Sequence, residues 1–270
     1  MAPRWLPLES NPDVMNKFVK QLGLQGPYGF VDVFGLDADL LTMVPRPVAA
    51  VLLLYPISEK SEATALGVEE ENKEVYFIKQ TIGNACGTIG VIHALANNTD
   101  KITLAGGNNF LANFLAKTKD ISPDERAKKL EIDPVSTDVG VMVAFFRFHI
   151  FVGGNNFLAN FLAKTKDISP DERAKKLEID PDIGAAHEAS AQEGQTQPPP
   201  IDEKVDLHFV TFVHNNGGLY ELDGRKNAPK RHGNTTADTL LEDAAAVVKK
   251  FMARDPDNIH FTVVALAKTD

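Results

Sequence analysis

The stretch that most constrains the fold is residues 48–56, VAAVLLLYP, which is apolar along its whole length. A strand with one solvated face would alternate apolar and polar residues, whereas a strand buried on both faces reads as a continuous apolar run. We therefore predict that residues 48–56 form a central strand. The whole chain is then predicted to be one α/β (α+β) domain over residues 1–270, an antiparallel sheet with helices beside it.

The other periodic segments fit this architecture. Asn11 and Pro12 provide an N-cap and a first-turn proline for a helix that runs to about residue 23. A strong turn at residues 215–218 joins two strands into a hairpin. The remaining predictions are strands at 30–34, 205–214, 219–224 and 261–267, helices at 37–43 and 236–254, and loops at 58–73 and 187–200.

Composition narrows the classes of function. The chain has 270 residues with 37 acidic and 28 basic side chains, a net charge of −9, which argues against nucleic acid as the main partner and favours a basic protein surface. The N-terminus lacks a signal-peptide pattern, and no 18-residue uncharged span suggests a membrane helix. One cysteine excludes a disulfide framework and a thiolate zinc site, so we expect no metal or cofactor and a reducing compartment, the cytosol or the nucleus.

That single cysteine, Cys86, lies in a segment that reads as a strand at 75–78, a turn at 83–84 and an apolar helix that continues through 89–96. A thiol near a helix N-terminus is stabilised as a thiolate by the unpaired N–H groups and the helix dipole. Taken alone, however, a lone cysteine is more often a small buried apolar side chain. Its role therefore depends on which other residues accompany it.

Three other residues complete a candidate hydrolase site. A thiol nucleophile needs an imidazole within hydrogen-bond reach, and the imidazole needs a carboxylate to fix its tautomer. His208 and Asp223 lie on the two arms of the predicted hairpin, and Gln80, six residues before Cys86, is placed to donate to an oxyanion. Each signal is weak alone, because a strand histidine is often structural and Asp before Gly often forms a turn. His214 is the rival base.

Six segments spread along the chain carry a specific resemblance: RWLPLESNP (4–12), MVPRPVAAVLLL (43–54), KQTIGNACGTIGVIHALANN (79–98), EGQTQPPPIDEKVDLHF (193–209), LYELDGRK (219–226) and LLEDAAAVVKKFMARDP (240–256). On these segments the sequence resembles the ubiquitin carboxyl-terminal hydrolases of the small cytosolic type over nearly its whole length. The resemblance implies a papain-like cysteine hydrolase with a knotted backbone that cleaves after the terminal glycine of ubiquitin. It also implies that Cys86 is the nucleophile, His208 the general base and acid, Asp223 the orienting carboxylate and Gln80 the oxyanion donor.

The resemblance also implies where ubiquitin binds. The partner would be ubiquitin, a related modifier or a ubiquitin C-terminal adduct, with no nucleic acid or membrane involved, and the chain would act as a monomer. Contacts are expected from the N-terminal arm, from a crossover loop at about residues 191–198 that arches over the active site, and from the region of the last strand at about residues 258–263. The corresponding residues are Pro7, Leu8, Glu9, Ala191, Gln192, Glu193, Gly194, Asn258, His260 and Phe261.

One feature departs from the family pattern. Residues 106–134 recur without a change at 153–181, a period of 47 residues, and each copy contains two helical pieces, the second capped in the first copy by Ser122. Residues 135–181 thus read as an inserted duplication that contains an apolar run at 139–152. If the first copy fills the family's helical position, the crossover loop is enlarged; if the second does, the loop keeps its size. An alternative function is a ubiquitin-binding protein with little turnover because the insertion perturbs the site.

Overall fold

The sheet is the framework of the molecule. The computed structural model describes residues 4–104, 157–194 and 205–269. Seven strands form one sheet in the order β2-β9-β3-β6-β7-β8-β4, with every neighbouring pair antiparallel. These strands are β2 (Tyr28–Asp32), β9 (Thr262–Lys268), β3 (Val48–Pro56), β6 (Leu207–Asn215), β7 (Gly218–Leu222), β8 (Lys230–Asn234) and β4 (Val68–Glu69). A second pair consists of β1 (Leu24–Gln25) and β5 (Thr103–Leu104).

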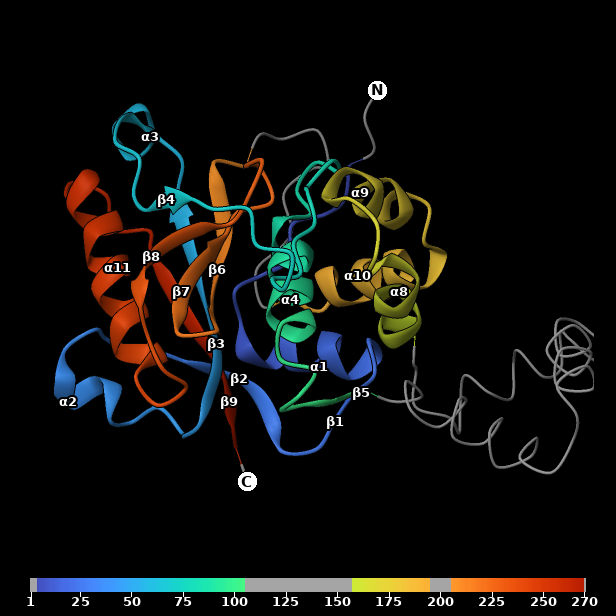
Figure 1. Ribbon diagram of the computed structural model, residues 1–270, viewed down its shortest axis with the longest axis horizontal. Helices are drawn as coiled ribbons and strands as arrows, with labels where there is room; N and C mark the ends of the chain where they lie inside the picture. Colours follow the sequence, from blue (N-terminus) through green and yellow to red (C-terminus); the bar gives the residue numbers. More distant parts are fainter. Residues whose placement is uncertain (1–3, 105–156, 195–204, 270) are drawn as a thin grey trace, which may run out of the picture.

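Helices cover both faces of this sheet (Figure 1). One face carries α11 and the short α2; the other carries α1, α4 and the group α8 to α10. None of the helices in the described ranges is long and apolar enough to cross a membrane. The described helices are α1 (Pro12–Gln21), α2 (Ala38–Leu41), α3 (Glu59–Ala63), α4 (Cys86–Ala96), α8 (Phe157–Thr165), α9 (Pro170–Glu178), α10 (Pro181–Ala191) and α11 (Leu240–Arg254).

Strand β3 explains why both faces are covered. The prediction of a buried central strand is confirmed, with the predicted bounds. Ala50 and Leu52 enter the core beneath α1 and α4, whereas Val51 and Leu53 enter the core beneath α11, and all four side chains are 0% exposed. Because successive strand residues point to opposite faces, an apolar run of this kind requires a packed layer on each side.

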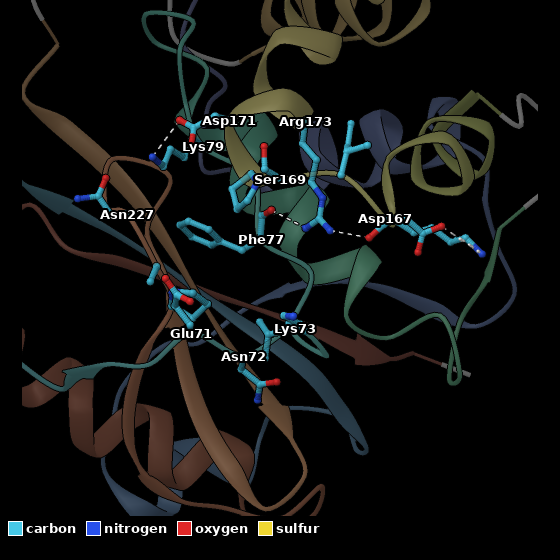
Figure 2. Close-up of a pocket in the computed structure, with 16 residues that line it drawn as sticks. Glu71, Asn72, Lys73, Phe77, Lys79, Asp167, Ser169, Asp171, Arg173 and Asn227 are labelled. Atoms are coloured by element: carbon cyan, nitrogen blue, oxygen red, sulfur yellow. Dashed lines mark hydrogen bonds and ion pairs between the residues drawn. The ribbon is translucent and has the colours of Figure 1, made fainter.

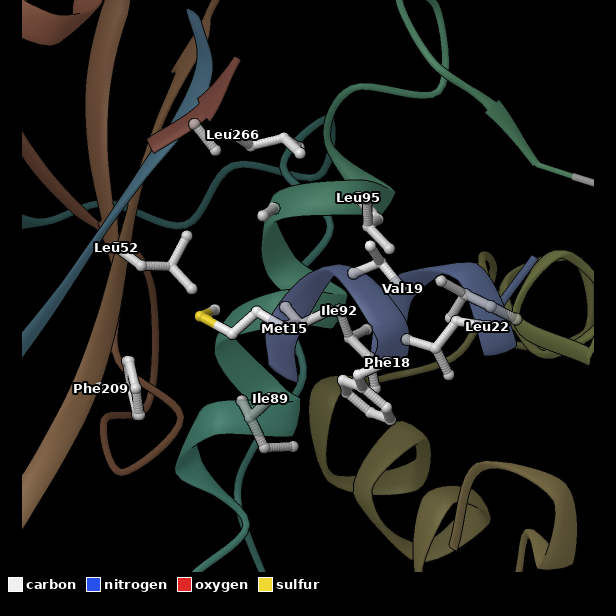
Figure 3. Packing of buried hydrophobic residues seen from close by; sticks show 14 of the residues in the cluster. Met15, Phe18, Val19, Leu22, Leu52, Ile89, Ile92, Leu95, Phe209 and Leu266 are labelled. Atoms are coloured by element: carbon white, nitrogen blue, oxygen red, sulfur yellow. The ribbon is translucent and has the colours of Figure 1, made fainter. Parts of the chain in front are cut away.

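The core that holds the cysteine helix lies between α1, α4 and the sheet (Figure 3). Met15 and Phe18 of α1 pack there with Ile89 and Ile92 of α4, and each is at most 3% exposed. Burying one side chain of this size stabilises a fold by about 1.5–3 kcal/mol. The start of α4 is therefore fixed by its packing.

Local signals predicted several elements correctly. Helix α1 begins where predicted, and Asn11 Oδ1 accepts a hydrogen bond from the Asp13 N–H at 2.9 Å. The hairpin of β6 and β7 is confirmed, and Asn216 at its turn has a positive φ of 44°. Two loop predictions are wrong. The segment 58–73 contains α3, capped by Ser58, and the edge strand β4; the segment 187–200 begins within α10, which continues to Ala191.

The second copy of the repeat packs into the core. Its two helical pieces are confirmed as α8 and α9, and Ser169 and Glu172 form the expected capping box. Leu158 of α8 and Leu177 of α9 are at most 1% exposed. The first copy and the apolar run at 139–152 lie outside the described residues. The mixed α/β fold is as predicted, and the knot stays a prediction.

Candidate active site

Cys86 is the first residue of α4, as the sequence predicts. The preceding Asn84 takes a left-handed φ of 62°, a conformation that asparagine tolerates, and so turns the chain into the helix. Ala85 at the N-cap has no side-chain oxygen to occupy the first N–H groups of the helix. These groups remain available to an anion, and the Gly87 N–H contributes to the environment of the thiol.

His208 and Asp223 meet at one end of the hairpin. The His208 Nε2 to Asp223 Oδ1 distance is 2.7 Å, and both side chains are at most 3% exposed. The ladder between β6 and β7 ends on this side at Thr211 and Leu222, so Asp223 lies one residue beyond it, and His208 lies three residues beyond it, where β6 pairs with β3. The Arg225 N–H also donates to Asp223 Oδ1 at 2.9 Å. The carboxylate therefore holds the imidazole through Nε2, which leaves Nδ1 free of this contact, and the ring lies near enough to Cys86 for each group to shift the pKa of the other.

The three groups favour the thiolate–imidazolium state. Burial alone would raise the pKa of Cys86, but the hydrogen bond and positive charge of His208 outweigh it and lower that pKa. Burial would likewise lower the pKa of His208, but the hydrogen bonds and charges of Asp223 and Cys86 outweigh it and raise that pKa to about 9. Burial would raise the pKa of Asp223, and the bond to His208 reverses this shift. At neutral pH the arrangement therefore supports a nucleophilic sulfur beside a proton donor.

Gln80 is held beside the end of the hairpin. The predicted strand at 75–78 is wrong as a sheet strand: the segment pairs with none of the described strands. The Gln80 backbone N–H donates to the Gly224 carbonyl at 2.8 Å, and its side-chain Nε2 donates to the Ile82 carbonyl at 3.1 Å. The amide keeps a second N–H for another acceptor. A Cβ at position 224 would lie 3.0 Å from Gln80 Cβ, so glycine permits this close approach.

A cavity of about 260 Å³ opens beside Cys86. It brings together four of the residues predicted to contact ubiquitin, namely Pro7, Leu8, Glu9 and Ala191. The rest of its wall was not predicted, because neighbours that belong to separate strands and loops are set by tertiary packing. These additional lining residues are Ser10, Leu54, Val205, Leu207 and Phe209. The lining is mostly apolar and suits a narrow extended chain.

His187 fixes the N-terminal arm that forms one wall of this cavity. Its Nε2 lies 2.7 Å from the Leu6 carbonyl oxygen and its Nδ1 lies 2.6 Å from Thr88 Oγ1. The Trp5 ring packs on the imidazole with centroids 4.4 Å apart. Burial lowers the pKa of His187 to about 4, so the ring is neutral at physiological pH. Sequence reasoning missed this residue because it placed position 187 in a loop.

The other predicted contact residues lie outside the cavity. Gln192 donates through Nε2 to Glu188, and Glu193 forms an exposed ion pair with Lys17 at 2.8 Å. Gly194 is half-buried at the end of the described segment. Asn258, His260 and Phe261 precede β9, whose Thr262 pairs with the cavity residue Leu54. They thus lie one strand away from the cavity.

The rival base His214 is far from the other groups. It lies six residues along β6 from His208, a span of about 20 Å for a strand. Its Nε2 accepts a hydrogen bond from the Gly217 N–H at 3.1 Å. His214 therefore supports the turn, and the structure brings only His208 to Asp223 and Cys86.

Comparisons with known proteins agree with this geometry. Residues 5–144 and 148–253 match the sequence profile of ubiquitin carboxyl-terminal hydrolase, family 1. The chain is 47% identical to a ubiquitin carboxyl-terminal hydrolase of Aplysia californica, over 94% of this chain and 97% of the relative. It is 40% identical to ubiquitin carboxyl-terminal hydrolase 3 of Arabidopsis thaliana, over 99% and 95% of the two chains, and 38% identical to isozyme L1 of Homo sapiens, over 97% of each.

Solved structures show the same fold. The catalytic domain of Trichinella spiralis UCH37, crystallised with ubiquitin vinyl methyl ester, superimposes with a TM-score of 0.67 at 21% identity, over 98% of this chain and 96% of that one. The similarity at this level of identity establishes the fold that the two chains share, while the sequence matches establish the family. The chain therefore belongs to ubiquitin carboxyl-terminal hydrolase family 1, a family of cysteine hydrolases.

Proposed function

We propose that the chain hydrolyses amide and ester bonds that follow the C-terminal glycine of ubiquitin, with Cys86 as the nucleophile. The observation that carries this proposal is the 2.7 Å contact of His208 with Asp223, on a histidine near enough to Cys86 for each of the two groups to shift the pKa of the other. The thiol begins a helix and the other two residues end a hairpin, so segments more than 100 residues apart supply one site. A cysteine with only a packing role would need neither the histidine nor the aspartate beside it.

The chemistry follows from these positions. The Cys86 thiolate attacks the carbonyl carbon of the terminal glycine, and the carbonyl oxygen takes up negative charge. The free side-chain N–H of Gln80 and the backbone N–H of Cys86 donate to this oxyanion. The His208 imidazolium gives its proton to the departing amine or alcohol, which leaves a thioester on Cys86. His208, now neutral, takes a proton from water, and the hydroxide attacks the thioester carbonyl carbon. The C–S bond breaks, the carboxylic acid leaves and loses its proton to solvent, and the Cys86 thiolate and His208 imidazolium are restored.

The surroundings of Cys86 favour the tail of ubiquitin as the acyl group. The adjoining cavity of about 260 Å³ is too small for a folded domain and suits an extended chain that ends in glycine. Glu9 on its wall supplies a carboxylate for a basic tail. Ubiquitin vinyl methyl ester, an electrophile at the C-terminus of ubiquitin, is the ligand of the Trichinella structure of the same fold. These observations support ubiquitin, or a modifier with a similar tail, as the substrate.

We also propose that the second repeat copy fills the family's helical position and that the 47 additional residues precede it. The buried Leu158 and Leu177 support this assignment, because both belong to the second copy. Residues 182–194 then follow α9 directly, and the crossover loop keeps its family length. Deleting residues 135–181 or residues 106–152 produces the same shortened sequence, because the copies are identical. This shortened chain is expected to retain hydrolysis.

The experiment is hydrolysis of ubiquitin that carries a fluorogenic C-terminal amide. The wild-type chain and the shortened chain are expected to release the fluorophore, and Cys86→Ala is expected to abolish release while it retains ubiquitin binding. A wild-type chain that binds ubiquitin but releases no fluorophore would instead identify a binding protein without turnover. Loss of activity in the shortened chain alone would show that the extra residues are required.

The cytosol or nucleus remains our proposal for the compartment. Cys86 is partly accessible and unpaired, and its pKa is lowered, so an oxidising compartment would inactivate it. A fluorescent fusion in cells is expected in the cytosol or nucleus, and retention in the secretory pathway would contradict the proposal.

A further inference from the structure

The segment that carries Gln80 is held by side chains in place of a neighbouring strand. On the side of α4, Asn97 bonds both backbone groups of Tyr76, accepting from its N–H at 2.8 Å and donating to its carbonyl at 2.9 Å. Two residues later, His93 Nε2 lies 3.1 Å from both backbone groups of Ile78. The backbone groups of these two alternate residues therefore face the cysteine helix.

The intervening residues bond to α9. Arg173 Nη1 donates to the Phe77 carbonyl at 2.6 Å, and the Lys79 N–H donates to the Pro170 carbonyl at 3.4 Å. The Lys79 ammonium also pairs with Asp171 Oδ1 at 2.9 Å. Figure 2 shows Arg173 and Asp171 reaching from α9 to this segment. The chain entering Gln80 is thus held between two helices.

Arg173 is an unusual residue in this arrangement. Its side chain is largely buried, with the residue 8% exposed, and its three nitrogens donate to three backbone carbonyls, those of Thr165, Lys166 and Phe77. The guanidinium lies 4.1 Å from the centre of the Tyr76 ring. Within the described ranges no carboxylate pairs with it, and burial lowers its pKa. Burying a cation costs free energy, and a planar guanidinium that bonds three separate carbonyls indicates a role beyond packing.

A cavity lies beside the segment that carries Gln80, on the side where Arg173 bonds the Phe77 carbonyl. A cavity of about 750 Å³ lies between α9, residues 71–79 and the loop 227–229, and Phe77, Lys79 and Arg173 line it (Figure 2). On this side the Phe77 carbonyl accepts the Arg173 hydrogen bond, and both residues line the cavity. Three residues after Phe77, the Gln80 backbone N–H donates a hydrogen bond to the Gly224 carbonyl.

We propose that Arg173 is a positioning residue that sets the place of the Gln80 amide, and this inference rests on the proposed function. The guanidinium bonds the turn between α8 and α9 with two nitrogens and the Phe77 carbonyl with the third. Movement of α9 is therefore transmitted to the segment that ends at Gln80. A displacement of about 1 Å at an oxyanion donor is sufficient to lower turnover by about 100-fold.

The test compares Arg173→Gln and Arg173→Lys in hydrolysis of the fluorogenic ubiquitin amide. Arg173→Gln is expected to lower kcat by about 10- to 100-fold with KM changed by less than about 2-fold, because Arg173 does not line the cavity beside Cys86 that we propose for the ubiquitin tail. Arg173→Lys keeps the charge but loses the planar fork, and it is expected to recover little activity. An unchanged kcat in Arg173→Gln would overturn the proposal.

A double variant separates positioning from general destabilisation. If Arg173 acts through Gln80, then Gln80→Ala with Arg173→Gln is no slower than Gln80→Ala alone. Additive losses would show that Arg173 acts by another route and would refute the proposal. The chain also offers a matched control in Arg126, the same residue in the first repeat copy. Arg126→Gln is expected to retain wild-type kcat, and an equal loss there would contradict the assignment to Arg173.

Amide hydrogen exchange tests the same proposal without any enzyme activity. Protection of the Gln80 N–H, which bonds the Gly224 carbonyl, is expected to fall at least about 10-fold in Arg173→Gln but not in Arg126→Gln. Unchanged protection would overturn the inference. If the wild-type chain hydrolyses no ubiquitin derivative while Arg173→Gln loses protection at Gln80, the proposed function fails and the positioning contact stands.

Discussion

Replacing Asp223 with asparagine tests whether the negative charge of Asp223 keeps His208 protonated. Asp223 is 2% exposed, and its Oδ1 accepts hydrogen bonds from His208 at 2.7 Å and from the Arg225 N–H at 2.9 Å. Asparagine keeps the size of the side chain and an oxygen acceptor but removes the negative charge. The variant therefore changes the electrostatics of His208 with little change in packing.

The magnitude follows from the pKa of His208. Burial opposes the charged ring, and the hydrogen bonds and charges of Asp223 and Cys86 nevertheless raise its pKa from 6.5 to about 9. At about 1.4 kcal/mol per pKa unit, the net preference for the imidazolium is about 3 kcal/mol. Burial is the largest single influence on this ring, so without the opposing charge of Asp223 the pKa of His208 falls. We expect turnover at pH 7.5 to fall by about 100-fold or more, the range of general acid–base catalysis.

The assay is the pH dependence of kcat/KM for the fluorogenic ubiquitin amide. Because the active form pairs a Cys86 thiolate with a protonated His208, wild-type activity is expected to rise through the lowered pKa of Cys86 and to decline as pH rises through about 9. In Asp223→Asn the alkaline decline is expected to move down by about 2 pH units. An alkaline decline at the wild-type position would refute the role given to the Asp223 charge.

Three further outcomes are expected. Leu177→Ala should lower the free energy of unfolding, measured by urea denaturation, by about 3 kcal/mol. Leu130→Ala, its counterpart in the first copy, should lower it by less than about 0.5 kcal/mol. Equal losses would contradict the assignment of the second copy to the family's helical position. Burial lowers the pKa of His93 from 6.5 to about 4, so the folded state favours the neutral ring. The free energy of unfolding is therefore expected to fall by about 2 kcal/mol between pH 7 and pH 5. A loss in the wild-type chain no larger than the loss in His93→Gln would refute this. A Cβ at Gly87 would lie 2.9 Å from Leu8 Cβ and would displace the N-terminal arm that lines the cavity. Gly87→Ala should therefore raise KM for the ubiquitin amide by about 10-fold. An unchanged KM would contradict a role for the N-terminal arm in substrate binding.

Elements with strong local signals were predictable from sequence. The apolar run of β3 and the cap Asn11 with Pro12 each specify their element without tertiary information, and both are confirmed. The same capping signal at Asp180 and Pro181 begins α10, but the polar composition after residue 187 led to a loop prediction. Strand β8, KRHGN, was missed because neither an apolar run nor a clean alternation marks this strand near the edge of the sheet.

The candidate site was predictable only in part. The hairpin brings His208 to Asp223 because the strand register is local, and the residues of that pair were predicted from their spacing. The roles of Arg173 and His187 depend on contacts with segments 96 and 181 residues away, which no local pattern encodes. Likewise, the segment before Gln80 has the composition of a strand, but side chains of two helices take the place of the neighbouring strand.

The most direct test of the account is covalent capture of Cys86. Ubiquitin with a C-terminal vinyl electrophile is expected to add one ubiquitin mass to the wild-type chain, and peptide mass spectrometry is expected to find the adduct on Cys86. Cys86→Ala should remain unlabelled, and His208→Gln should label far more slowly because its thiol is no longer held as a thiolate. Absence of the adduct from the folded wild-type chain, or labelling that persists in Cys86→Ala, would contradict the central claim.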